Sequence, residues 1–246
     1  MKKLSVLLKT ESMKLRRSPI LLISFFAALL TAFFVFFADP NRYASHLGWY
    51  IDELQPWSIF FLLPSITALL GSYLICREKD DDTFKTLRLI PVSPIQLTLV
   101  KLFLTFSLTI ILSLFLFTFS IFGELILHHS LLPLSSMFHM LRQYLLNGIG
   151  IFLAVLPFIT VCSFQKNGQW IALILTEIYS ITGLFAGIAD PFRTYYPITA
   201  IFQLSGYYPA DFNKRLISLL ILLLCGTLSL FVLWIFHGTK KTTATV

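Results

Sequence analysis

The sequence predicts an all-α polytopic membrane protein with six transmembrane helices and an amphipathic surface helix before the first of them. Hydrophobic residues make up 57% of the 246 positions and charged residues only 13%, about half the charged fraction of a typical soluble domain. The apolar residues form blocks of about 20, the length that a helix needs to cross ~30 Å of hydrocarbon. Basic residues gather in alternate connecting segments, as in membrane proteins that span the bilayer repeatedly.

We expect the six spans at residues 19–38, 57–76, 97–121, 144–164, 170–188 and 216–236. These runs are continuously apolar, whereas the strands of a membrane barrel would alternate. Helices also satisfy every backbone amide within lipid. Pro64 and Pro157 fall inside spans and predict kinks. The first block follows a basic segment, but it is too long for a signal peptide and no small-residue cleavage motif follows it, so we expect it to be retained.

The distribution of Lys and Arg predicts the orientation. Thirteen basic residues fall in the segments 1–18, 77–96, 165–169 and 237–246, and five fall in 39–56, 122–143 and 189–215. The positive-inside rule therefore places both termini in the cytoplasm and the chain in the inner, cytoplasmic membrane. The net charge of +7 lies beside apolar blocks, so we expect anionic lipid headgroups as its partner and no nucleic acid.

No enzyme motif is present in the sequence. There is no phosphate-binding loop, no zinc-protease motif and no nucleophile elbow. Cys76, Cys162 and Cys225 lie in separate apolar blocks without metal-ligand or redox spacing, and paired His128 and His129 point different ways on a helix. We therefore predict that the chain is not an enzyme and binds neither a metal nor a cofactor of its own.

Residues 1–18 predict a helix that lies on the inner membrane surface. At 100° per residue one face is apolar and basic residues surround it; the apolar positions are Leu4, Leu7, Leu8 and Leu15. Glu11 falls within this apolar stripe, where a carboxylate needs a partner. It either reaches the headgroups or contacts a partner protein or a basic residue at the rim of the bundle.

Segment 77–96 predicts a short charged helix on the cytoplasmic face. Aspartates open it and Lys85 and Arg88 close it, which complements the helix dipole. Phe84 and Leu87 share one side, and Pro91 ends the helix. The alternative is a solvated connector, because charge runs usually face water.

Span five carries a carboxylate, Glu177, near its middle. A charged residue at that depth indicates a functional site. A stripe of small residues runs beside it, formed by Thr176, Ser180, Gly183 and Gly187. Glu177 is either a buried hydrogen-bonding residue between helices or part of the substrate path. In either case we expect a hydrogen-bonding partner in another span, such as Thr105, Thr109, Ser113 or Asn147.

These segments together resemble the permease subunits of ABC-2 type exporters, most closely the lantibiotic-immunity and related peptide-antibiotic permeases. The pattern is Glu11-x-x-Lys14-x-x-Arg17-Ser18, Pro64 in span two, and Glu78 followed by Thr83, Leu87, Pro91 and Lys101. The resemblance covers the whole chain in topology and about the first 105 residues in motifs. The family commonly has glycine before the threonine, where this chain has Asp82, so the start of the coupling helix differs.

The resemblance implies one ABC-2 transmembrane domain over residues 1–246, with an interfacial helix at 1–18 and a cytoplasmic coupling loop at 77–96. Two permease subunits, identical or homologous, would pair above two ATPase subunits that bind ATP and Mg²⁺. The residues expected at the ATPase are Glu11, Glu78, Thr83, Phe84, Leu87 and Pro91. The implied function is ATP-driven removal of an amphipathic peptide antibiotic or similar hydrophobic compound from the membrane. The alternative function is a membrane sensor or assembly scaffold that transports nothing.

Overall fold

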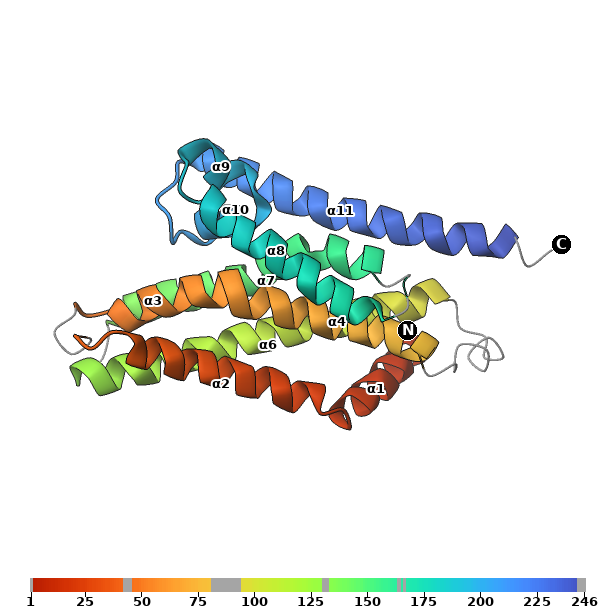
Figure 1. Ribbon diagram of the computed structural model, residues 1–246, viewed down its shortest axis with the longest axis horizontal. Coiled ribbons are helices and arrows are strands. Elements are labelled where there is room, and N and C mark those ends of the chain that lie inside the picture. Colours follow the sequence, from red (N-terminus) through yellow and green to blue (C-terminus); the bar gives the residue numbers. More distant parts are fainter. Residues whose placement is uncertain are drawn as a thin grey trace.

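The computed structural model describes residues 2–41, 46–80, 94–129, 133–162, 165 and 167–242, with side chains except at 2–4, 78–80 and 236–242. The described part is a bundle of roughly parallel and antiparallel helices (Figure 1). Six helices in it are long and apolar enough to cross a membrane. The predicted all-helical fold with six spans is therefore confirmed.

The first two spans and the surface helix come from the N-terminal third of the chain. They comprise α1 (Lys2–Arg16), α2 (Ile20–Ala38), α3 (Trp49–Trp57), the π-helix η2 (Ser58–Leu62) and α4 (Leu63–Asp80). The remaining elements are α6 (Pro94–His128), α7 (Leu134–Cys162), α8 (Gly168–Ala186), α9 (Asp190–Tyr195), α10 (Pro197–Ser205) and α11 (Phe212–Thr242).

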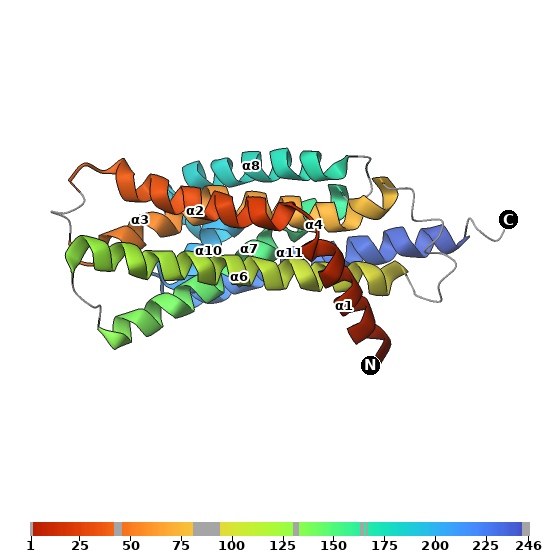
Figure 2. The same cartoon turned by 90° about the horizontal axis from the view of Figure 1, so that it is seen from below.

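The surface helix α1 and the C-terminal end of α11 lie at the same end of the bundle (Figure 1), as an even number of spans requires. We name this the inner end, following the predicted orientation. Pro19 directly precedes α2, a position where the N–H that proline lacks would have no partner within the helix. The chain turns there. Figure 2 shows α1 crossing α6 near the inner end, and the two helices pack against each other.

Span two is longer than predicted and is interrupted. It begins at Trp49 rather than at residue 57, because α3, η2 and α4 follow one another without a loop. Pro56 lies in the last turn of α3 and has no N–H for the helix ladder. The π-helix follows directly, and such turns widen the hydrogen-bond spacing and often occur at functional sites.

Spans three and four also extend further toward the outer end. α6 has 35 residues and reaches His128, which gives a length of about 52 Å against a hydrocarbon thickness of ~30 Å. α7 begins at Leu134 rather than at residue 144. The predicted outer loop over 122–143 is therefore wrong for most of its length. Polar residues lowered the local hydropathy of this segment. Glu124 and Gln143 are nevertheless buried in the bundle, whereas Ser135, His139 and Arg142 are exposed.

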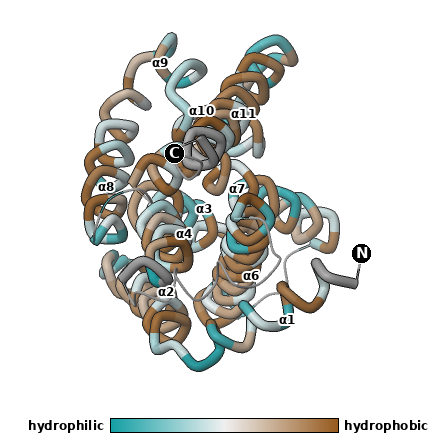
Figure 3. Tube along the Cα trace, turned by 90° about the vertical axis from the view of Figure 1, so that its right-hand side faces the viewer, coloured by the Kyte–Doolittle hydropathy of each residue, from teal (hydrophilic) through white to brown (hydrophobic). Residues whose placement is uncertain are grey.

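The outer segment 189–215 is not an open loop. Its first half forms α9 and α10, and α10 packs against α7, α8 and α11. Ile198, Ile201 and Phe202 have no exposed surface. In Figure 3 hydrophobic residues also cover the outside of the bundle, where large side chains such as Phe26 and Phe185 are exposed. An apolar exterior is what a lipid-facing surface requires.

Candidate functional site

At the inner end, the apolar face of α1 is pressed against the bundle. Leu15 and Glu11 are 3% and 4% exposed, so Glu11 lies on the covered side of α1 and not on its free surface. Lys14 Nζ lies 2.5 Å from Glu11 Oε1, one turn further along α1. The basic residue in this contact belongs to α1 itself, so the predicted contact of Glu11 with a partner protein or with the rim of the bundle stays a prediction.

A tyrosine of span two connects the turn between α1 and α2 to the segment that precedes the coupling loop. Ser18 Oγ donates a hydrogen bond to Tyr73 Oη at 3.1 Å. The guanidinium carbon of Arg77 lies 5.8 Å from the centre of the Tyr73 ring, within the range of a cation–π interaction. The turn between α1 and α2 thus meets the C-terminal part of α4 at Tyr73.

The coupling loop itself is only partly described. Glu78 belongs to the last turn of α4, and its side chain lies outside the described residues. Thr83, Phe84, Leu87 and Pro91 all lie outside the described residues. Their predicted role at an ATPase stays a prediction.

The small-residue stripe of span five faces the interior, as predicted for close helix packing. Thr176 and Ser180 have no exposed surface, and a Cβ added to Gly183 would lie 2.9 Å from the Tyr196 ring. Ser180 Oγ donates a 2.5 Å hydrogen bond to the carbonyl oxygen of Phe60 in η2. This bond joins α8 to the interrupted turn of span two and gives that carbonyl a partner.

Glu177 lies beside this stripe and is half-buried. It makes no hydrogen bond or ion pair with any residue that the structure describes. The predicted partners Thr105, Thr109, Ser113 and Asn147 instead bond elsewhere, so Glu177 has none of the predicted partners and no other partner among the described residues. The reason is geometric: Thr176 and Ser180 occupy the inward face, and the next position points to the edge of the helix.

The interior of the bundle contains a polar stripe that the sequence analysis did not identify. It follows one face of α6 and comprises Thr98, Lys101, Thr105, Thr109, Ser113, Ser120 and Glu124, each at most 8% exposed. Several of these residues bond to other spans. The Thr109 and Thr67 hydroxyls are 3.1 Å apart, Ser113 Oγ donates to the Tyr144 carbonyl at 2.5 Å, and the Ser120 and Tyr144 hydroxyls are hydrogen-bonded to each other. The stripe joins α6 to α4 and α7.

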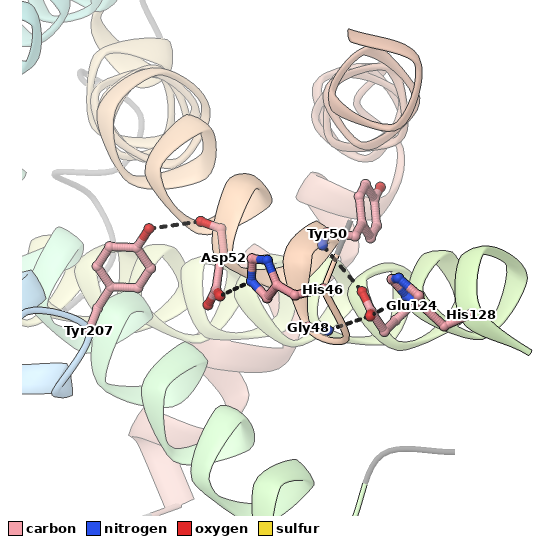
Figure 4. Close-up of polar contacts among 7 residues, drawn as sticks. All are labelled: His46, Gly48, Tyr50, Asp52, Glu124, His128 and Tyr207. Carbon is pink, nitrogen blue, oxygen red and sulfur yellow. Dashed lines mark hydrogen bonds and ion pairs between the residues drawn. The ribbon is translucent and has the colours of Figure 1, made fainter. Parts of the chain in front are cut away.

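The outer end of this stripe is a carboxylate junction (Figure 4). Glu124 is 1% exposed and accepts hydrogen bonds from the backbone N–H groups of Gly48 and Tyr50. His128 Nδ1 lies 2.7 Å from its Oε1. The first N–H groups of a helix have no partner within the helix, so a carboxylate from α6 caps α3 and fixes where span two begins.

Tyr50 of α3 completes this junction by contacting α2 and α6. Its hydroxyl donates to the Ala32 carbonyl of α2 at 2.7 Å. Its ring lies against Gly123 of α6, where any added Cβ would overlap the ring carbons. Gly123 is therefore required for its small size, because only hydrogen leaves room for the tyrosine.

A second polar cluster lies below the junction. Gln55 Nε2 donates to Gln143 Oε1 at 3.0 Å, and Asn147 Nδ2 lies 3.4 Å from Gln55 Oε1. Gln143 is also 3.3 Å from a ring nitrogen of His139. These amides bridge α3 and α7 within the bundle, where they hold helices together by hydrogen bonding.

Near the outer surface, Tyr207 joins the loop after α10 to α3. Its hydroxyl donates to the Asp52 carbonyl at 2.8 Å, and the Asp52 carboxylate lies 3.4 Å from His46 (Figure 4). Burial raises the pKa of Tyr207, and burial also raises the pKa of Tyr196 to about 12. Both phenols are therefore neutral hydrogen-bond donors at physiological pH.

A signal for these missed residues was present in the sequence. The polar positions of this α6 stripe recur at intervals of three or four residues from Thr98 to Glu124, with one interval of seven between Ser113 and Ser120, which is the spacing of one helix face. Glu124 and His128 are four apart, which places them on the same side. A search for apolar blocks averages the hydropathy of all faces of a helix, so it does not detect a polar stripe on one face.

The arrangement is suited to holding and moving helices rather than to bond chemistry. Among the described residues no group of three or more His, Cys, Asp or Glu side chains could hold a metal ion. All three cysteines have free thiols. The outer end of the molecule is held together by hydrogen bonds, span five carries a carboxylate without a partner among the described residues, and α1 lies at the inner end.

Comparison with known protein families gives one match. The model of the ABC-2 family transporter protein matches residues 7–183, which is more than half of the chain and extends from α1 to Gly183 in α8. A search of curated proteins finds no match. The chain belongs to the ABC-2 transporter family and is a multi-pass membrane permease of that family.

Proposed function

We propose that the chain is the permease subunit of an ATP-driven exporter that removes a cationic amphipathic compound, such as a peptide antibiotic, from the membrane. Family membership supports the transporter class. The observation that carries the substrate class is Glu177, a half-buried carboxylate in the middle of a span without a partner among the described residues. A charge at this depth is costly unless an opposite charge meets it.

The energy source in this proposal is a separate ATPase, because the sequence has no phosphate-binding loop. ATP and Mg²⁺ would bind there and not to this chain. We propose that it contacts Glu78, Thr83, Phe84, Leu87 and Pro91. The loop follows α4, Tyr73 of α4 is hydrogen-bonded to Ser18 in the turn after α1, and α1 packs against α6. Movement of the loop would thereby reach spans one to three, and bundles of this kind shift between discrete packed arrangements.

A second permease subunit, either a copy of this chain or a homologue, belongs to the same proposal. Glu177 lies on α8, whose neighbouring side chains Ile174 and Ile178 are exposed. A partner subunit at this face would enclose the carboxylate between two permeases. The cytoplasmic membrane and cytoplasmic termini follow from the charge asymmetry of the sequence.

The test is reconstitution of the chain with its co-encoded ATPase in vesicles. We expect a cationic amphipathic peptide to stimulate ATP hydrolysis more than a neutral peptide of equal hydrophobicity. Replacing both Phe84 and Leu87 by Asp should release the ATPase during purification while the permease stays inserted, because two charges replace the apolar side of the coupling helix. Co-purification of the double variant at the wild-type ratio would contradict the proposed contact, and equal stimulation by both peptides would contradict the proposed substrate.

A further inference from the structure

The lipid-facing surface contains a groove that the transport proposal does not use. It lies between α6 and α11, both of which pack on α7 and hardly contact each other, so α7 forms its floor. Its volume is about 460 Å³. The walls are apolar side chains from all three helices, among them Phe103, Phe106, Phe152 and Leu223.

A glycine and a threonine give the groove its shape. A Cβ at Gly226 of α11 would lie 3.0 Å from Leu153 of α7, so the glycine lets the two helices approach at the back of the groove. Thr227 is the polar residue at its wall, and its hydroxyl already donates to the Leu224 carbonyl at 3.1 Å. The groove therefore presents no unmet hydrogen-bonding group and suits a hydrocarbon chain.

The position of the groove indicates which hydrocarbon fills it. The wall formed by α6 runs from Leu99 to Phe106, in the first turns after the helix begins at its inner end. α1 packs against the same helix, and Figure 3 shows α1 on the side of α6 and α7, away from α8. The basic residues Lys9, Arg16 and Arg17 at α1 are exposed. Apolar walls, together with exposed basic residues on a helix that packs against the same α6, complement an anionic phospholipid.

We infer that the groove binds one acyl chain of an anionic phospholipid from the cytoplasmic leaflet, with its headgroup at the basic residues of α1. Lipid chains and leucine side chains are similarly apolar, so the hydrophobic effect contributes little here. The acyl chain is held by dispersion contacts that an unfilled groove would lose, and the lipid headgroup adds electrostatic attraction. This inference requires the membrane topology only and does not depend on the transported substrate.

The experiment uses the full-length protein in vesicles that contain phosphatidylglycerol or phosphatidylcholine with the same diazirine-bearing acyl chain. After illumination, labelled positions are mapped by mass spectrometry. We expect more labelling of the groove from phosphatidylglycerol than from phosphatidylcholine. The comparison surface is the apolar face of α2 around Phe33 and Phe37, which should show little difference between the two lipids.

Thr227→Phe fills the groove from its open side without altering the contact between Gly226 and Leu153. Its matched control is Leu220→Phe, at an exposed position of the same helix outside the groove. The first variant should reduce groove labelling to the level of the α2 face, and the control should leave it unchanged. Undiminished labelling in Thr227→Phe, or equal labelling by both lipids, would overturn the inference. Efficient cross-linking between two copies through cysteine at Leu223 would also overturn it, because a second copy would then occupy the groove.

Discussion

Glu124 and Glu177 are carboxylates of two membrane-spanning helices of this protein, and their surroundings differ completely. Glu124 of α6 is 1% exposed and accepts hydrogen bonds from two backbone N–H groups, with His128 beside it. Glu177 of α8 is half-buried and has no such partner among the described residues. The first carboxylate is satisfied by its own chain, whereas the second is the group that we propose to meet a cationic substrate.

The difference separates a part of the bundle that is held together from a part that is available for a ligand. Around Glu124, side-chain hydrogen bonds join α3, α6 and α7. α8 has small residues at its contact with span two, and among the described residues one side-chain hydrogen bond joins them, from Ser180 to Phe60. Buried polar groups that are satisfied stabilise a fixed arrangement, so we assign Glu124 to the fold and Glu177 to transport.

The largest expected effect follows from removing the capping carboxylate. Glu124→Leu leaves the N–H groups of Gly48 and Tyr50 buried without acceptors, at about 1–3 kcal/mol for each group. Thermal unfolding in detergent should show a large loss of stability, and membrane abundance should fall. Glu124→Gln is the matched control, because it retains an acceptor oxygen and should lose much less. Equal stability of the leucine variant and the wild type would refute the capping role.

A smaller loss is expected from Gly123→Ala. The new methyl group meets the Tyr50 ring, which cannot withdraw easily because its hydroxyl is bonded to Ala32. Overpacking of this kind costs about 1–3 kcal/mol in unfolding free energy. A double variant with Tyr50→Leu should recover part of the loss, since the two sites are in contact. Strictly additive losses in unfolding free energy would argue against the contact.

The smallest effect should come from Ser180→Ala, which removes the bond between α8 and η2. Side-chain hydrogen bonds between membrane helices contribute about 0.6 kcal/mol on average. The variant should therefore fold nearly as well as the wild type in a thermal unfolding assay. Ser107→Ala is the control, since Ser107 is only partly buried and bonds within its own helix to Phe103. If Ser180→Ala lost as much thermal stability as Glu124→Leu, the contrast between the two regions would be contradicted.

The sequence was sufficient to predict the number of spans and the surface helix, because both depend on long apolar runs and on helical periodicity. It also placed Thr176, Ser180 and Gly183 on an interior face of span five, since a stripe of small residues has few other uses in lipid. These features are local, so the residues near them in the chain determine them.

The carboxylate junction could not be predicted in the same way. Glu124 and Gly48 are 76 positions apart, and only the packed bundle brings them together. The polar side chains near residue 124 resemble a loop when hydropathy alone is considered, and Gln55 and Gln143 were assigned to loops for the same reason. α10 was missed because its apolar run is too short to span a membrane, although it is long enough to pack against three helices.

The most direct test of the assignment is export activity per inserted molecule for Glu177→Gln, measured in vesicles with a cationic amphipathic peptide. Thermal unfolding of the same preparation serves as the control. We predict wild-type stability and ATPase association with a nearly complete loss of peptide export, because the amide removes only the negative charge. Wild-type export by Glu177→Gln would contradict a role for the charge in transport. Loss of folded protein would instead place Glu177 with Glu124 as a residue that serves the fold.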